Sequence, residues 1–186
     1  MDAAADRARL LQLLTERSFE RRKVVLSSGR ESDFYIDCKR TALTAEGHVL
    51  VGRLLWRAIL DTCPDAVGVG GLTLGADPLA SAVSLTSFLL GRPLAAFIVR
   101  KEPKGHGTGQ WVEGLSSFAP GDRVAVVEDV VTTGASTLKA LERARAEGLS
   151  PTHAFALVDR LEGGREAVEA AGYQLVSLFT RRDFIP

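Results

Sequence analysis

Hydrophobic residues along the chain follow two spacings that alternate. Between Thr44 and Thr62 they recur every three or four residues, which predicts a helix with one buried face and with Thr44 as its N-cap. From residue 124 to 127 they form an unbroken, mostly β-branched run, which predicts a buried parallel strand. Similar segments precede and follow these two.

The predicted elements alternate along most of the chain. Helices are predicted at residues 2–19, 44–62, 76–90, 138–144 and 164–171. Strands are predicted at residues 24–26, 32–37, 65–69, 94–99, 124–127, 153–158 and 173–178. This order is typical of an α/β fold, a mostly parallel twisted sheet flanked by helices. We predict a single domain over residues 1–186, in which about the first 40 form a helix and a small hood.

Composition narrows the classes of function. Lys and Arg number 23, equal to Asp and Glu, so the net charge gives no support for a nucleic-acid or membrane partner. The two cysteines, Cys38 and Cys63, are far apart, which predicts a reduced compartment without a zinc site or a disulfide framework. The N-terminal residues lack an apolar signal core, and no apolar run reaches the length of a membrane span. We therefore expect a cytoplasmic protein.

Unusual polar and glycine-rich segments follow the predicted strands. They are residues 70–75, 100–109 and 128–136, together with Arg160. In parallel α/β sheets, ligands bind beyond the carboxyl ends of the strands. The sequence therefore predicts one ligand site at that edge.

The segment from Glu128 to Ser136 combines two kinds of ligand-binding group. Glu128 and Asp129 come where the buried strand is predicted to end, and carboxylates accept hydrogen bonds from the vicinal hydroxyls of a sugar. Small and hydroxylated residues then precede a helix, where backbone N–H groups and the helix dipole favour an anion. Together they predict a pocket for a ribose with a 5'-phosphate. The alternative is an ordinary strand–turn–helix with a well-capped helix, although carboxylates at a buried strand end are costly without partners.

The residues from Val126 to Gly134 resemble the phosphoribosyl pyrophosphate (PRPP) signature of type I phosphoribosyltransferases. In that family two acids hold the ribose 2' and 3' hydroxyls, and the following loop wraps the 5'-phosphate. The resemblance implies that Asp129 is also catalytic. It implies PRPP binding by Glu128, Asp129, Val130, Val131, Thr132, Thr133, Gly134, Ala135 and Ser136.

A cationic segment lies between Arg100 and Gly109. Arg100, Lys101, Lys104 and His106 fall within seven residues, and this density of positive charge fits a polyanion such as pyrophosphate. Its glycines and the lack of apolar residues predict a mobile loop that closes over the substrate. A solvated charged loop is the alternative.

The cationic segment resembles the catalytic loop of the orotate phosphoribosyltransferase family. The resemblance implies that Arg100, Lys101, Lys104 and His106 contact PRPP and act in catalysis. In that family the loop reaches the neighbouring subunit's site, which implies a homodimer with shared sites. Residues 28–37 also resemble the family's segment over the base and ribose, although a hairpin packed on the core is the simpler interpretation.

The same resemblance places orotate beside Thr132 and Arg160. A guanidinium suits the carboxylate and carbonyl edge of orotate, since its fork binds two oxygens, but Arg160 could equally be a structural ion-pair partner. Two positions depart from the family, because Ser27 and Leu74 stand where many members carry lysine. Both changes remove a cation near the expected phosphates.

The activity implied is transfer of ribose 5-phosphate from PRPP to N1 of orotate, giving orotidine 5'-monophosphate and pyrophosphate in pyrimidine biosynthesis. Mg²⁺ is the implied cofactor, held through PRPP and water with no direct protein ligand. Two alternatives remain, a phosphoribosyltransferase for another base and a non-catalytic PRPP sensor on the same fold. The sequence contains no P-loop, dinucleotide fingerprint or G-x-S-x-G motif.

Overall fold

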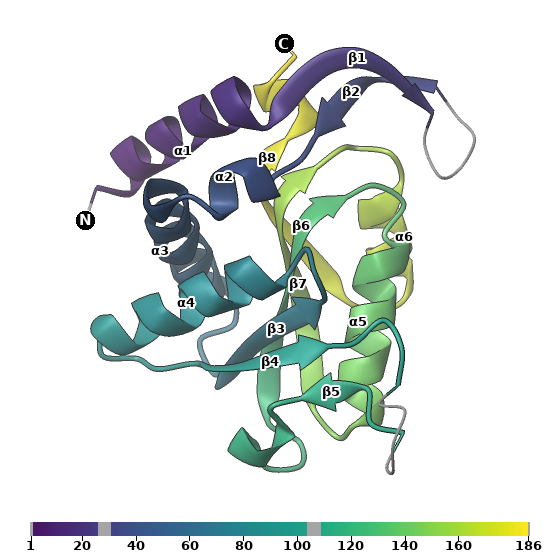
Figure 1. The fold of residues 1–186 in the computed structure, drawn as a ribbon. Coiled ribbons are helices and arrows are strands. Elements are labelled where there is room, and N and C mark those ends of the chain that lie inside the picture. The colour runs from purple at the N-terminus through teal and green to yellow at the C-terminus, as the bar shows by residue number, and fades with distance from the viewer. Residues whose placement is uncertain (1, 26–30, 104–108, 186) are drawn as a thin grey trace.

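A computed structural model describes residues 2–25, 31–103 and 109–185 of the chain. Its centre is a six-stranded sheet in the order β5-β4-β3-β6-β7-β8 (Figure 1). The strands are β3 (Gly68–Leu72), β4 (Ala95–Val99), β5 (Val112–Glu113), β6 (Arg123–Val131), β7 (Ser150–Asp159) and β8 (Gln174–Thr180). All neighbours are parallel except β5, which pairs antiparallel with β4. The predicted fold class is confirmed.

Helices cover both faces of this sheet. Helices α3 (Ala45–Thr62) and α4 (Asp77–Leu89) lie on one face, and α5 (Ala135–Ala146) and α6 (Gly164–Ala170) on the other (Figure 1). Successive residues of β6 alternate between the two apolar cores: Ala125 and Val127 pack under α3 and α4, whereas Val124 and Val126 pack under α5. Burial on both faces explains the unbroken apolar run that predicted this strand.

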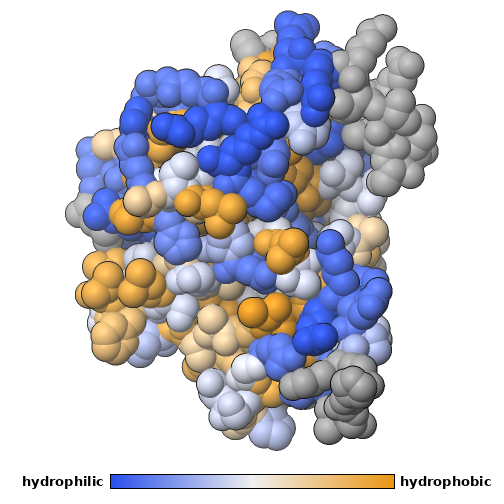
Figure 2. Space-filling view, in the orientation of Figure 1, coloured by the Kyte–Doolittle hydropathy of each residue, from blue (hydrophilic) through white to orange (hydrophobic). Residues whose placement is uncertain are grey.

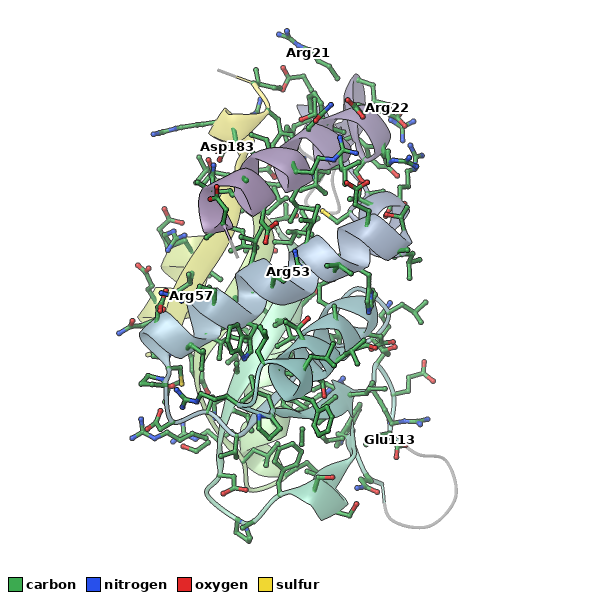
Figure 3. The ribbon with its side chains drawn as sticks, turned by 90° about the vertical axis from the view of Figure 1, so that its left-hand side faces the viewer. Arg21, Arg22, Arg53, Arg57, Glu113 and Asp183 are labelled. Carbon is green, nitrogen blue, oxygen red and sulfur yellow. The ribbon has the colours of Figure 1, made fainter. Side chains whose placement is uncertain are left out.

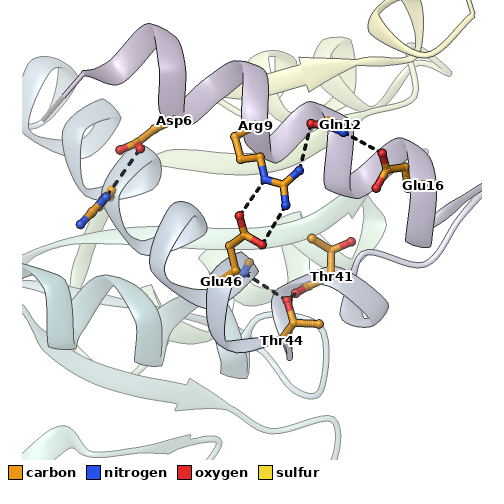
Figure 4. Close-up of polar contacts among 9 residues, drawn as sticks. Asp6, Arg9, Gln12, Glu16, Thr41, Thr44 and Glu46 are labelled. Carbon is orange, nitrogen blue, oxygen red and sulfur yellow. Dashed lines mark hydrogen bonds and ion pairs between the residues drawn. The ribbon is translucent and has the colours of Figure 1, made fainter.

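The hood consists of α1 (Ala3–Arg17), the antiparallel pair β1 (Phe19–Val25) and β2 (Glu31–Ile36), and a short helix α2 (Lys39–Ala42). Two ion pairs join α1 to α3, Arg9–Glu46 at 2.7 Å and Asp6–Arg53 at 3.6 Å (Figure 4). The ring of Phe34, fully buried, lies 5.7 Å from that of Phe184 near the C-terminus. The hood therefore packs on the core through both charge and aromatic contacts.

Helix α3 begins as its sequence predicts. The Thr44 hydroxyl accepts the Gly47 N–H at 3.1 Å and donates to the Thr41 carbonyl at 2.8 Å. Figure 3 shows α3 crossing the molecule beside α4, with Arg53 and Arg57 on its surface. No helix among the described residues is both long and apolar enough to cross a membrane.

The loop predicted at Gly70–Gly75 is shorter than expected, because β3 continues to Leu72. Both glycines lie where neighbouring strands leave no room for a side chain. A Cβ on Gly70 would lie 2.3 Å from the Phe97 carbonyl oxygen, and one on Gly71 would lie 2.2 Å from that of Val127. Close packing within the sheet therefore explains these residues, and a turn does not.

Strand β6 is longer than predicted. It continues past Glu128 and Asp129, and Val130 and Val131 still pair in parallel with Val158 and Asp159 of β7. The two valines after the acids extend the β-branched pattern and keep the ladder intact. The prediction that the acids lie where the strand ends is therefore wrong: the acid pair lies inside the sheet, two residues before its edge. Strand β5 and helix α2 were also not predicted, because both are too short to show a period.

Candidate active site

The ends of β6 and β7 bring two predicted site residues together. The Arg160 N–H donates to the Val131 carbonyl oxygen at 3.0 Å, so Arg160 lies beside Thr132 at the carboxyl edge of the sheet. Gly134 and Gly164 meet below them, where a Cβ on Gly134 would lie 2.8 Å from the Gly164 carbonyl oxygen. Residues far apart in the sequence therefore meet at the predicted edge.

A small cavity lies at the start of α5. Its volume is about 150 Å³, and its lining is Val130, Val131, Thr132, Thr133, Gly134, Ala135, Ser136 and Thr137. Gly134 precedes the helix with a φ of 81°, a left-handed conformation that favours glycine. Helix α5 begins at Ala135, so the cavity receives unpaired backbone N–H groups and the positive end of the helix dipole. This chemistry suits a phosphate group.

The acid pair lies beside this cavity with its two side chains in different surroundings. Glu128 is only 5% exposed, and within the described part of the chain its Oε2 atom has no hydrogen-bond partner. Burial, reinforced by the neighbouring Asp129 carboxylate, raises the pKa of Glu128 to about 8. Asp129 lies nearer the surface, and its Oδ1 accepts the Val130 N–H at 2.9 Å. At neutral pH Glu128 therefore holds a proton beside Asp129.

Lys39, which sequence reasoning missed, and Gly75, which belongs to the predicted segment at residues 70–75, both lie against Asp129. The ammonium of Lys39 lies 3.6 Å from Asp129 Oδ2 and 2.9 Å from Asp37 Oδ1. On the other side, a Cβ on Gly75 would lie 2.6 Å from Asp129 Oδ1. Lys39 could have been found from its sequence, since Asp37-Cys38-Lys39-Arg40 places charges directly after a predicted strand. The sequence places Gly75 in a glycine-rich segment at the predicted site, but its packing against Asp129 depends on a contact across the sheet.

The cationic segment is described only in part. Lys104 and His106 lie outside the described residues. Arg100 pairs with Glu113 at 3.0 Å, and Lys101 is exposed; both line a hollow of about 380 Å³ (Glu113 is labelled in Figure 3). In the described ranges no hydrogen bond or ion pair joins Arg100 or Lys101 to the acid pair. The structure therefore does not bring these cations into contact with the acids.

Helix α5 anchors the base of the cationic segment. The guanidinium of Arg143 lies 3.7 Å from the centre of the Trp111 ring and donates to the Arg100 carbonyl oxygen. The Trp111 N–H donates to Glu147 at 2.9 Å, and Arg100 N–H donates to the Trp111 carbonyl oxygen at 2.9 Å. The helix that begins at the phosphate-sized cavity thus ends at the base of the cationic segment. The predicted site residues do not include this connection.

Arg160 joins the hood to the sheet. Its Nη2 donates to the Phe34 carbonyl oxygen at 2.8 Å and lies 3.0 Å from Glu162, and the residue is almost fully buried. Arg160 therefore does form a structural ion pair, as the alternative interpretation of its sequence position predicts. The Arg160 backbone lies beside Thr132 through its hydrogen bond to Val131, so the residue still stands at the carboxyl edge where a ligand role is predicted.

Of the two residues that depart from the family pattern, the structure describes only Leu74. Ser27 lies outside the described residues. Leu74 is 69% exposed, between Thr73, whose hydroxyl donates to Asp77 at 2.6 Å, and Gly75. The exposed apolar side chain at this position puts no charge beside the loop.

The pKa of Glu128 predicts how stability depends on pH. The pKa of Glu128 in the folded protein lies above its ordinary value of 4.5. Its contribution to stability is therefore fully present below pH 4.5 and is lost as the pH rises to about 8. Glu128→Gln should therefore become more stable relative to wild type by up to about 1.4 kcal/mol per pH unit in this window. Chemical denaturation at a series of pH values measures the difference. The exposed Glu142→Gln should show no such trend, and parallel curves for Glu128→Gln and wild type would contradict the burial cost.

Comparison with known proteins identifies relatives over the whole chain. No family model matches the sequence. An orotate phosphoribosyltransferase of Sorangium cellulosum is 60% identical over 98% of this chain and 95% of its own length. That of Aquifex aeolicus is 46% identical over 94% of both chains.

Solved structures agree with these relatives. The orotate phosphoribosyltransferase of Mycobacterium tuberculosis in complex with PRPP superposes with a TM-score of 0.78 and 39% identity, covering 96% of this chain and 98% of that one. Identity at this level over nearly complete chains exceeds what a shared fold alone requires. The chain belongs to the orotate phosphoribosyltransferase family.

Proposed function

We propose that this chain transfers ribose 5-phosphate from PRPP to N1 of orotate, with the residues of the carboxyl edge in the roles given below. One observation carries the proposal: residues 128–137 place an acid pair directly beside a cavity of about 150 Å³ at a helix N-terminus. A phosphorylated ribose needs both features close together. Glu128 and Asp129 hold the ribose hydroxyls, and residues 130–136 hold the 5'-phosphate.

Positive charge develops on the ribose and negative charge on the pyrophosphate as the bond between them breaks. The C1–O bond to pyrophosphate breaks and the orotate N1–C1 bond forms as N1 gives up its proton to the departing pyrophosphate or to water. The ribose passes through a cationic state while pyrophosphate leaves as an anion. On this proposal Asp129 stabilises the developing positive charge. Arg100, Lys101, Lys104 and His106 neutralise the pyrophosphate, and Thr132 and Arg160 hold orotate for attack. Catalysis on this proposal consists of positioning and electrostatics.

The residues of this site fit a Mg²⁺ ion that binds together with PRPP and has no direct protein ligand. Among the described residues no three His, Cys, Asp or Glu side chains lie close enough to hold a metal ion. The isolated acid pair, with Lys39 beside Asp129, does not form an oxygen cage. We propose that PRPP oxygens and water hold Mg²⁺, which supplies positive charge to the leaving pyrophosphate.

Product formation tests the substrate assignment directly. Purified protein with PRPP and Mg²⁺ is given orotate, adenine, guanine, hypoxanthine or uracil, and nucleotide formation is followed by chromatography. We expect turnover with orotate alone and its loss with a chelator. Turnover with a purine instead, or PRPP binding without turnover of any base, would support the two alternative functions and overturn this one.

Arg160→Ala tests the orotate site separately. The substitution removes the guanidinium proposed to bind orotate, so KM for orotate should rise by roughly ten- to a hundredfold while KM for PRPP changes little. Arg182→Ala, which removes an exposed arginine near the C-terminus, is the control and should leave both constants unchanged. A defect confined to PRPP would contradict the role of Arg160.

Gly75→Ala tests whether the position of Asp129 matters. A methyl group at residue 75 would lie 2.6 Å from Asp129 Oδ1 and must displace this short side chain. We expect kcat/KM for PRPP to fall by about ten- to a hundredfold, with unfolding free energy changed by less than about 1 kcal/mol. Gly148→Ala should lower the unfolding free energy and leave kcat/KM for PRPP unchanged. Gly148 has a φ of 88°, which strains a residue with a side chain, and no atom lies near its missing Cβ. Equal activity in the two variants would argue against the placement of Asp129.

We further propose that the chain is a single-domain cytoplasmic enzyme that works as a homodimer. Four exposed apolar side chains of α3 and α4 form the apolar patch, namely Val49, Leu85, Phe88 and Leu89. Val49, Leu85 and Leu89 border a cavity of about 310 Å³ between the two helices, and Figure 2 shows hydrophobic residues gathered over the left end of α4. Phe88 and Leu89 are 71% and 72% exposed, which is costly unless another surface covers them. A second copy of the chain is the occupant proposed.

The combined substitution Phe88→Asp and Leu89→Asp tests this interface. Light scattering should give wild type twice the chain mass of 19.9 kDa and the variant the mass of one chain, because two charges cannot be buried between apolar surfaces. Ala170→Asp places a charge on α6, on the opposite face of the sheet, and should remain dimeric. A dimeric double variant would exclude the apolar patch as the interface.

A further inference from the structure

Lys39 lies at the junction between the hood and the acid pair. It opens α2, where its own N–H donates to Asp37 Oδ1 at 3.2 Å and its ammonium lies 2.9 Å from the same oxygen. The ammonium also lies 3.6 Å from Asp129 Oδ2 on β6. One cation therefore connects a carboxylate of the hood with a carboxylate of the central strand.

The ammonium is held by charge more than by packing. Its side chain is 43% exposed, and the hydrogen bond from Lys39 to Asp37 raises the pKa of Lys39, with a further contribution from Asp129. Burial acts in the opposite direction and is a smaller effect than the hydrogen bond to Asp37. The titratable and charged groups that surround the ammonium come from the end of β2, from α2 and from β6: Asp37, Cys38, Arg40, Glu128 and Asp129.

The contacts of Asp129 leave its carboxylate little freedom. Oδ1 accepts the Val130 N–H and faces Gly75, whose side is closed to any larger residue. Oδ2 faces Lys39, and the side chain is only 14% exposed. Among the described residues Lys39 is the one cation that pairs with Asp129. Because an aspartate has only two side-chain torsions, these three contacts suffice to define its direction.

We propose that Lys39 is a positioning residue for the transfer reaction, whose ammonium, held by Asp37, fixes the Asp129 carboxylate in the orientation that accepts the ribose hydroxyls of PRPP. This inference rests on the proposed function and adds a residue from the hood to it. Each carboxylate oxygen keeps a further lone pair after its contact with Lys39 or Val130, so the ribose hydroxyls can still donate to it. The ammonium also offsets the repulsion between Asp129 and the phosphates of incoming PRPP.

Lys39→Met tests the inference, because methionine keeps an unbranched side chain and removes the charge. We expect kcat/KM for PRPP to fall by about ten- to a hundredfold, KM for orotate to change by less than about twofold, and Lys39→Arg to recover much of the loss. Arg57→Met is the matched control: it removes a surface cation from α3, paired only with Asp61 in the described structure, and should keep full activity.

A double-mutant cycle separates action through Asp129 from direct contact with substrate. If Lys39 acts by orienting Asp129, Lys39→Met should add less than about twofold to the defect of Asp129→Asn. The pH profile supplies a second readout that a merely structural role does not move. Loss of the cation removes the hydrogen bond and the charge that lower the pKa of Asp37, so the acidic limb of kcat/KM for PRPP should shift upward.

Each outcome bears on the inference in a defined way. Full activity of Lys39→Met, or equal and independent losses in the double-mutant cycle, would overturn it. If Lys39→Met does not fold, Asp37→Asn removes the carboxylate that holds the ammonium and should show the same selective loss for PRPP; unchanged kinetics there would also overturn it. Failure of the proposed function is distinguishable, because wild type itself would then not convert orotate and PRPP to product.

Discussion

The central constraint on this molecule is a pair of adjacent carboxyls near the carboxyl end of the central parallel strand, of which Glu128 is buried and Asp129 lies nearer the surface. Strand β6 has apolar cores on both faces, and Glu128 and Asp129 interrupt it while its ladder with β7 continues. Two ionised carboxylates in such a place repel one another and lose hydration. The structure limits this cost by leaving Glu128 protonated at neutral pH and by giving Asp129 a backbone N–H and a lysine as partners.

The surrounding elements can be understood from that constraint. The loop after β3 must carry glycine at residue 75 to pass Asp129, and α2 must bring Lys39 to the same carboxylate. The hood contacts the end of β7 through the hydrogen bond from the Arg160 guanidinium to the Phe34 carbonyl oxygen. Helix α5 extends the arrangement outward, since it begins at the phosphate-sized cavity and ends against Trp111 at the base of the cationic segment. The site is thus assembled from segments that span nearly the whole chain.

The sequence predicted most of the fold, because long elements carry a clear hydrophobic period. Helix α3 and its Thr44 cap are confirmed, and Thr132 and Arg160 follow the ends of β6 and β7 as predicted. Element ends were less predictable: the glycines at 70 and 71 resemble a loop, but they pack against Phe97 and Val127 within a strand. No local pattern distinguishes these two uses of glycine.

Some residues of the site can likewise be found from a local pattern, and others only from the fold. Glu128, Asp129 and the hydroxylated loop are consecutive, so the sequence alone could assign them to one ligand. The contacts of Lys39 with Asp129 and of Arg143 with Trp111 join residues separated by tens of positions, and only the fold brings them together. The structure also leaves Arg100 paired with Glu113 and away from the acid pair, although the sequence predicts both at one substrate.

A crystal structure of the protein with PRPP and Mg²⁺ is the most direct measurement of the central claim. We expect the 5'-phosphate in the cavity lined by residues 130–137 and the ribose hydroxyls within hydrogen-bond distance of Asp129, with Lys39 still beside that carboxylate. A ribose bound elsewhere, or an Asp129 carboxylate turned away from it, would contradict the arrangement described above.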